Sequence, residues 1–214
     1  MTGESKVIIG VVVTTVIVLI AGVMVMSSSQ PPVPSAKVET STTLHGDAYS
    51  KGPKDAKVKI AEYADFQCPA CAVSFPIMKE IISDYGDKIY FEYHHYPLKQ
   101  HAWSQVSAEA AEAAGAQGKF WEYHDMLYAK QNDWAESKDA KSIFSKYAAE
   151  LKIDQKKFDE DLKNNTHRQK VLNSFNRGNT LSVQATPTYF VNGVRYEGGL
   201  NKEDWKKIID PLLK

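Results

Sequence analysis

Cysteine is scarce in this sequence, and neither sign of charge is in excess. Two of the 214 residues are cysteines, Cys68 and Cys71, which excludes a scaffold held together by several disulfides. The 26 lysine and arginine side chains are matched by 26 aspartate and glutamate side chains, so the formal net charge is zero. Proteins that bind nucleic acids carry a basic patch or an excess of basic residues. We therefore expect no nucleic-acid partner.

Charge is also absent from residues 7–26, which read VIIGVVVTTVIVLIAGVMVM. A helix of that length, at about 1.5 Å per residue, is about 30 Å long and matches the hydrocarbon core of a bilayer. The segment is therefore predicted to be a single-pass transmembrane anchor. A cleaved signal peptide is the alternative, but its apolar region usually spans only about 7 to 15 residues. Lys6 and the terminal amine favour a cytoplasmic tail over residues 1–6.

With that orientation, the rest of the chain lies on the extracytoplasmic side of the cell membrane, where disulfides persist. Residues 27–42 are rich in serine, proline and threonine and have little periodic apolar pattern. They are predicted to form an extended linker. The folded domain is predicted to span residues 43–214.

The order of segments in that domain predicts an α/β fold. β-prone runs cover residues 58–65 and 89–96, and a helix-like stretch lies between them. Helical patterns then continue over about residues 100–181. Asn192 and Gly193, between two apolar runs, predict a hairpin, and Asn201 is placed to cap a final helix. The domain is thus expected to be a small sheet interrupted by an α-helical insertion.

Both cysteines lie where the first strand gives way to a helix, in the sequence FQCPAC. Cys68 is therefore expected to face unpaired backbone N–H groups and the positive end of the helix dipole, which stabilise a thiolate. Pro69 suits the first helical position, where its missing N–H costs nothing. Cys71 follows on the same face and is expected to be the more buried, resolving thiol. Pro69 and Ala70, which form the turn between them, offer no charge to either sulfur.

Three other interpretations of the C-x-x-C pair remain open. It could be half of a zinc site, although the sequence has no second pair, and His94 and His95, adjacent on a strand, point to opposite faces. It could be an inert structural disulfide, although so short a loop restricts the unfolded chain little. It could also be two buried core thiols, which the position at a helix start disfavours.

From about Gly46 to its C-terminus, the sequence resembles the thioredoxin superfamily, and within it the DsbA-like thiol:disulfide oxidoreductases of bacterial envelopes. The resemblance rests on KIAEYADFQCPAC, on Thr186-Pro187 directly before the strand TYFVNG, on the helical block between these segments, and on GKFWEYHDMLY. It implies a thioredoxin fold with an inserted α-helical subdomain.

The resemblance also implies roles for three further residues. Glu62 matches a buried acid near the resolving cysteine, where a raised pKa would let it accept or return the Cys71 proton; an ordinary solvent-facing strand glutamate is the alternative. Pro187 matches the family's cis-proline, with a trans proline that starts a strand as the alternative. The Thr186 backbone would then lie beside the sulfurs and pair with an extended substrate peptide. One of His94, His95 and His101 could also approach the redox turn.

The function expected from these observations is that of a dithiol oxidase. Its partners would be exported proteins with free thiols and, as the resemblance implies, a membrane quinone-linked reoxidase of the DsbB-like or VKOR-like kind. No cofactor and no metal are expected. A disulfide reductase or isomerase on the same fold remains an alternative, and so does a non-catalytic chaperone that holds peptides.

Overall fold

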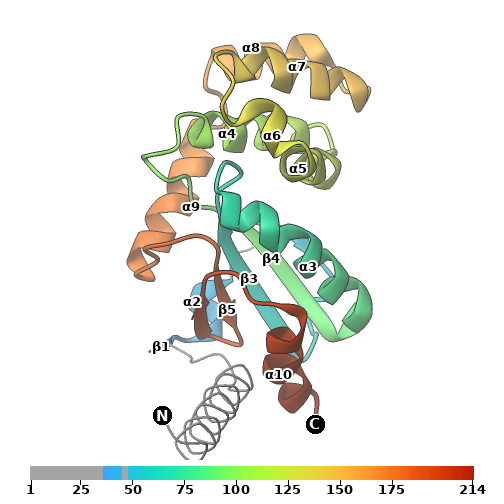
Figure 1. Ribbon diagram of the computed structural model, residues 1–214, viewed down its shortest axis with the longest axis vertical. Helices are drawn as coiled ribbons and strands as arrows, with labels where there is room; N and C mark the ends of the chain where they lie inside the picture. The colour runs from blue at the N-terminus through green and yellow to red at the C-terminus, as the bar shows by residue number, and fades with distance from the viewer. Residues whose placement is uncertain (1–35, 45–47) are drawn as a thin grey trace, which may run out of the picture. The chain divides into compact units, whose positions relative to one another are not determined.

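The computed structural model describes residues 36–44 and 48–214, and in these residues a mixed sheet has helices on both faces (Figure 1). The strands follow the order β1-β6-β5-β3-β4-β2 across the sheet. β3 and β4 run parallel, and the other neighbouring strands are antiparallel. The strands are β1 (Ala36–Lys37), β2 (Tyr49–Lys51), β3 (Val58–Ala64), β4 (Ile89–His95), β5 (Thr188–Val191) and β6 (Val194–Glu197).

Strand β3 divides its side chains between two apolar layers, as the period of two along a strand requires. Ile60 and Ala64 belong to the larger core, which includes residues of α3 (Pro69–Tyr85) and α10 (Lys202–Leu213). Ala61 and Tyr63 point to the opposite face and join a smaller cluster. Glu62 alternates with these residues and therefore shares the face covered by α3.

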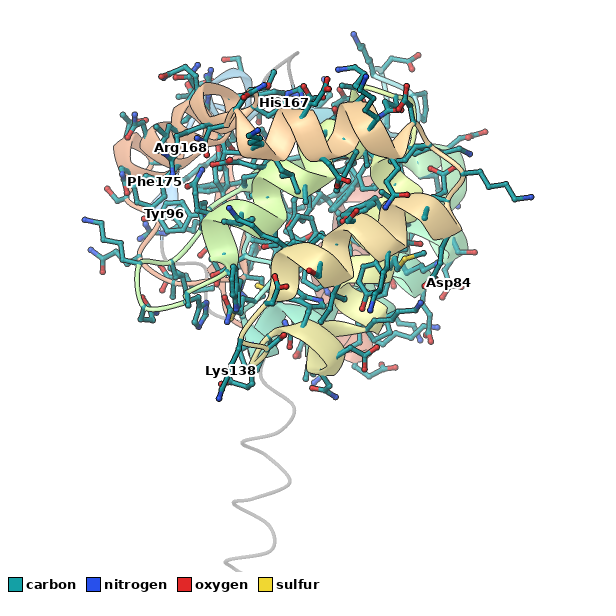
Figure 2. All side chains as sticks on the ribbon, turned by 90° about the horizontal axis from the view of Figure 1, so that it is seen from above. Asp84, Tyr96, Lys138, His167, Arg168 and Phe175 are labelled. Carbon is teal, nitrogen blue, oxygen red and sulfur yellow. The ribbon has the colours of Figure 1, made fainter. Side chains whose placement is uncertain are left out.

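The smaller cluster is closed by α9 (Arg168–Thr180), which packs against β4. Phe175 of this helix stacks on Tyr96, with ring centroids 4.8 Å apart, and the two rings lie side by side in Figure 2. Gly178 permits this approach, because a Cβ at that position would lie 2.5 Å from the Tyr96 ring.

The predicted helical insertion lies between β4 and β5 and ends with α9. Two of its helices begin at capping side chains: Asp139 accepts a hydrogen bond from the Ser142 N–H, and Asp154 accepts one from the Lys157 N–H. The other helices of the described residues are α2 (Thr40–Thr43), the 3₁₀ turn η1 (Gly86–Lys88), α4 (Ser104–Gly115), α5 (Phe120–Ala129), α6 (Gln131–Trp134), α7 (Ala140–Glu150) and α8 (Gln155–Lys163).

Two local signals at the C-terminal end of the sequence are confirmed. Asn192 and Gly193 both have positive φ, 46° and 81°, as a tight turn between β5 and β6 requires. Asn201 caps α10 in a capping box with Asp204, whose side chain accepts from the Asn201 N–H. This helix places Trp205 and Ile209 in the larger core.

The sheet begins within the segment predicted as the linker. Ala36–Lys37 pairs with β6, and the Val38 N–H donates to the Gly193 carbonyl at 2.8 Å. The unpaired backbone groups of an edge strand explain how two residues without an apolar pattern extend the sheet. The tail, the anchor and the rest of the predicted linker, residues 1–35, lie outside the described residues. Among the helices that are described, none has the length and apolarity to cross a bilayer.

Candidate functional site

The strand, turn and helix around the two cysteines are arranged as the sequence predicts. β3 ends at Ala64, Cys68 is the N-cap of α3, and Pro69 occupies the first helical position. Both cysteines are free thiols. Pro69 and Ala70 are exposed, whereas Cys68 and Cys71 are 7% and 1% exposed. The turn thus exposes Pro69 and Ala70 to solvent and buries the Cys71 thiol.

The surroundings of Cys68 favour its thiolate and lower its pKa from about 9 to about 5. The largest cause is a hydrogen bond from the Cys71 thiol, and a contact with Thr186 and the backbone N–H groups of Cys71 and Ala70 add to it. Partial burial opposes the shift. The sequence predicts the helix-start contribution, but the dominant hydrogen bond comes from the second cysteine.

Cys71 has the opposite tendency. Burial, followed by the hydrogen bond and the charge of Cys68, raises its pKa well above the ordinary value. Because one sulfur ionises readily and the other holds its proton, the pair is asymmetric. A thiolate with a low pKa is both populated at neutral pH and a good leaving group. Cys68 is therefore the sulfur suited to exchange with another molecule.

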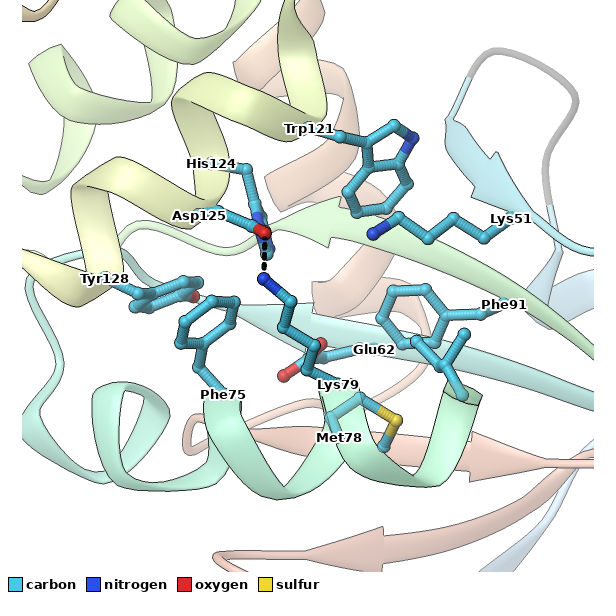
Figure 3. Close-up of a pocket in the computed structure, with 11 residues that line it drawn as sticks. Lys51, Glu62, Phe75, Met78, Lys79, Phe91, Trp121, His124, Asp125 and Tyr128 are labelled. Carbon is cyan, nitrogen blue, oxygen red and sulfur yellow. Dashed lines mark hydrogen bonds and ion pairs between the residues drawn. The ribbon is translucent and has the colours of Figure 1, made fainter. Parts of the chain in front are cut away.

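Glu62 lies on the buried face of β3, 5% exposed, and burial raises its pKa to about 7. Its negative charge is one of the causes that raise the pKa of Cys71. Glu62 lines a pocket together with Phe75, Lys79 and His124 (Figure 3), and the empty volume of this pocket is about 390 Å³. Lys79 donates to Asp125 at 2.7 Å beside this pocket. A carboxyl that titrates near neutral pH fits the predicted exchange of a proton with Cys71.

Thr186 and Pro187 lie beside the redox turn although 118 residues separate Cys68 from Thr186 in the chain. The bond between them is cis, as the resemblance implies. When it is protonated, the Cys68 thiol donates to the Thr186 carbonyl, with the sulfur and oxygen 3.4 Å apart. Thr186 and Pro187 are both buried and lead directly into β5. The segment expected to hold a substrate backbone is thus in contact with the exchanging sulfur.

The three candidate histidines, His94, His95 and His101, lie in different surroundings, and one of them reaches the redox turn. His94 stacks on Tyr63, with ring centroids 4.6 Å apart, and His95 contacts Glu112 at 3.0 Å, so they point to opposite faces of the sheet. His101 is the one that reaches the turn, where its Nδ1 lies 2.6 Å from Oδ2 of Asp65.

Asp65 is a site residue that the sequence interpretation did not identify. It lies between β3 and the redox turn and is almost fully buried. Besides the contact with His101, its carboxylate accepts from the Gln67 N–H at 2.8 Å, the Ser104 hydroxyl at 2.6 Å and the Leu98 N–H at 3.1 Å. An aspartate three residues before C-x-x-C has only a weak sequence signal, since apart from Gln67 these partners lie in the loop and helix beyond β4.

Comparison with known families identifies the domain. A family model described as Thioredoxin matches residues 45–211, most of the chain. The chain belongs to this thioredoxin family. The match covers the redox turn, the helical insertion and the segment at Thr186-Pro187, so the predicted fold class of the domain is confirmed.

Solved structures of several bacterial proteins share the fold. BdbD from Bacillus subtilis, in its oxidised form, is 24% identical, with a TM-score of 0.70 over 86% of this chain and 99% of that protein. The structure of alpha-DsbA1 from Wolbachia pipientis is 19% identical, with a TM-score of 0.71 over 79% of this chain and 92% of that protein. The structure of DsbA2 from Pseudomonas aeruginosa is 23% identical, with a TM-score of 0.62 over 79% of this chain and 96% of that protein.

The curated relatives are larger proteins, and this chain matches a part of each. The Na(+)/H(+) antiporter NhaA 1 of Salinispora arenicola is 38% identical over 154 residues, which are 72% of this chain and 23% of the antiporter. NhaA 3 of Salinispora tropica is 39% identical over 154 residues, which again are 72% of this chain and 23% of the antiporter. The chain thus spans about a quarter of the length of these antiporters.

Proposed function

We propose that this protein is a thiol:disulfide oxidoreductase that acts as a dithiol oxidase and introduces disulfides into exported proteins. The observation that carries the proposal is the asymmetry of the pair, with the Cys68 pKa lowered to about 5 and that of Cys71 raised. At pH 7, which is two units above that pKa, an ionised Cys68 stabilises the dithiol form by about 3 kcal/mol relative to an ordinary thiol. That corresponds to about 60 mV toward a more oxidising potential.

The reaction starts from the disulfide form. A substrate thiolate attacks the Cys68 sulfur, a mixed disulfide forms, and the bond to Cys71 breaks. The departing Cys71 sulfur takes a proton, for which Glu62 is the nearby acid. A second substrate thiolate then attacks the substrate sulfur of the mixed disulfide, and Cys68 leaves as a thiolate. The substrate has lost two electrons, and the enzyme has gained them as a dithiol.

The Thr186 backbone would hold the substrate as an added strand beside Cys68, largely independent of the substrate's side chains. The dithiol is then reoxidised, in this proposal, by a membrane quinone-linked partner of the DsbB-like or VKOR-like kind. An anchor over residues 7–26 would keep both proteins on one membrane surface and raise their effective concentration. No cofactor is needed, because the cysteine pair carries both electrons.

A reductase would transfer electrons in the opposite direction, from the dithiol to a substrate disulfide. A chaperone would not require the Cys68 thiol. The test mixes the oxidised full chain with a reduced peptide that contains two cysteines and measures free thiols. We expect one peptide disulfide per chain, and none from Cys68→Ser. Full activity of Cys68→Ser on a reduced protein substrate would favour the chaperone. Failure of the oxidised chain, together with rapid reduction of a disulfide substrate by the dithiol form, would favour the reductase.

A further inference from the structure

Gln131 connects the helical insertion to the backbone that carries Cys68. It is the first residue of α6 and is 7% exposed. Its side-chain nitrogen donates to the carbonyl of Phe66 at 2.7 Å and to the carbonyl of Cys68 at 3.0 Å. One amide group thus binds two peptide units of the redox turn from a helix more than sixty residues away in the chain.

Gln67, the residue between these two carbonyls, makes the reverse connection. Its side-chain nitrogen donates to the Ala135 carbonyl at 2.7 Å, and its side-chain oxygen accepts from the Trp103 N–H at 2.6 Å. The turn and the insertion therefore each contribute a glutamine that bonds to the other's backbone. Such an arrangement fixes the distance and the rotation of the turn relative to α6.

The orientation of these peptide units matters for the sulfur. The Cys68 carbonyl also accepts the Ala72 N–H at 3.1 Å, which forms the first hydrogen bond of α3. The backbone N–H groups of Ala70 and Cys71 are among the causes that lower the pKa of Cys68. Buried carbonyls that lose a donor tend to move toward another partner, because an unsatisfied polar group is costly. A shift of the Cys68 peptide unit would carry the N–H groups of this first turn away from the sulfur.

We propose that Gln131 is a positioning residue. Its side chain holds the first turn of α3 in the orientation that stabilises the Cys68 thiolate. The inference rests on the proposed function and deepens it, because it makes the oxidising strength of the pair depend on the helical insertion. A partner that moved α6 would change that strength without a contact to either sulfur.

The test compares Gln131→Met with Gln117→Met in the full chain. Gln117 is a matched control, because its side chain also makes two hydrogen bonds to backbone, donating to the Asp154 carbonyl and accepting from the Asp154 N–H, within the helical insertion. The readouts are the Cys68 pKa, from thiolate absorbance against pH, and the equilibrium constant with glutathione. For Gln131→Met we expect a higher pKa and a tenfold shift of the constant toward the disulfide form, which equals about 30 mV. We expect no change for Gln117→Met.

A second pair of variants keeps the test decisive if Gln131→Met fails to fold. Gln131→Asn retains the uncharged amide donor and is expected to stay within threefold of the wild-type constant, whereas Gln131→Leu, also uncharged, loses it and is expected to shift the constant about tenfold. An unchanged pKa and constant in Gln131→Met, or equal shifts in Gln131→Asn and Gln131→Leu, would overturn the inference. A wild-type Cys68 that ionises like an ordinary thiol would instead refute the proposed function.

Discussion

Removal of the Cys71 thiol tests how Cys68 acquires its low pKa. The hydrogen bond from Cys71 is the largest cause of the shift to about 5. A hydrogen bond to a charged group contributes about 1.5 to 3 kcal/mol, and one pKa unit corresponds to about 1.4 kcal/mol. Cys71→Ala is therefore expected to raise the Cys68 pKa by about one to two units. At pH 6 the thiolate fraction would fall from about nine-tenths to between about a half and about a tenth.

The assay follows thiolate absorbance against pH and, independently, the rate at which iodoacetamide alkylates Cys68. Cys71→Ser is the matched control, because its hydroxyl keeps a donor of similar length. We expect its Cys68 pKa to stay within about half a unit of the wild-type value. If the Cys68 pKa in Cys71→Ala equals the wild-type value, the hydrogen bond from Cys71 is not the source of the shift. The helix start and Thr186 must then supply it.

Two further predictions concern stability. The folded chain holds a proton on Glu62, whose pKa is about 7 against an ordinary 4.5, so stability falls as pH rises through that window, by about 3 kcal/mol in all. Glu62→Gln should therefore unfold at higher urea than wild type at pH 8 but not at pH 4, both in the oxidised form; equal midpoints at pH 8 would contradict the burial argument. Asn201→Ala removes the capping box of α10 and should cost about 1 kcal/mol in thermal unfolding, whereas an unchanged melting temperature would show that packing alone holds this helix.

The features that could be predicted from the sequence are those set by short-range chemistry. Pro69 after Cys68 indicates a helix start, Asn192 with Gly193 indicates a tight hairpin, and Asn201 indicates a cap. Each of these residues acts on backbone within a few positions of itself. The position of Pro187 opposite the cysteines could be predicted from the resemblance and not from spacing, since nothing local links segments so far apart.

The features that could not be predicted depend on contacts between distant segments. β1 and β2 have two and three residues, too few for a periodic pattern, and they exist because β6 and β4 offer unpaired edges. Gln131 looks like an ordinary polar residue of a helical block, and its importance follows from carbonyls that the fold brings to it. The predicted anchor over residues 7–26 stays a prediction.

The equilibrium of the full chain with reduced and oxidised glutathione measures the central claim most directly. Because the site stabilises the dithiol form through the Cys68 thiolate, we predict a reduction potential about 60 mV more oxidising than that of a pair with an ordinary thiol, shifted from the about −270 mV of reductases toward the about −120 mV of strong dithiol oxidases. The stabilisation should weaken as pH falls toward 5, where Cys68 takes up its proton. A potential near −270 mV, typical of reductases, with no such dependence on pH, would contradict the account.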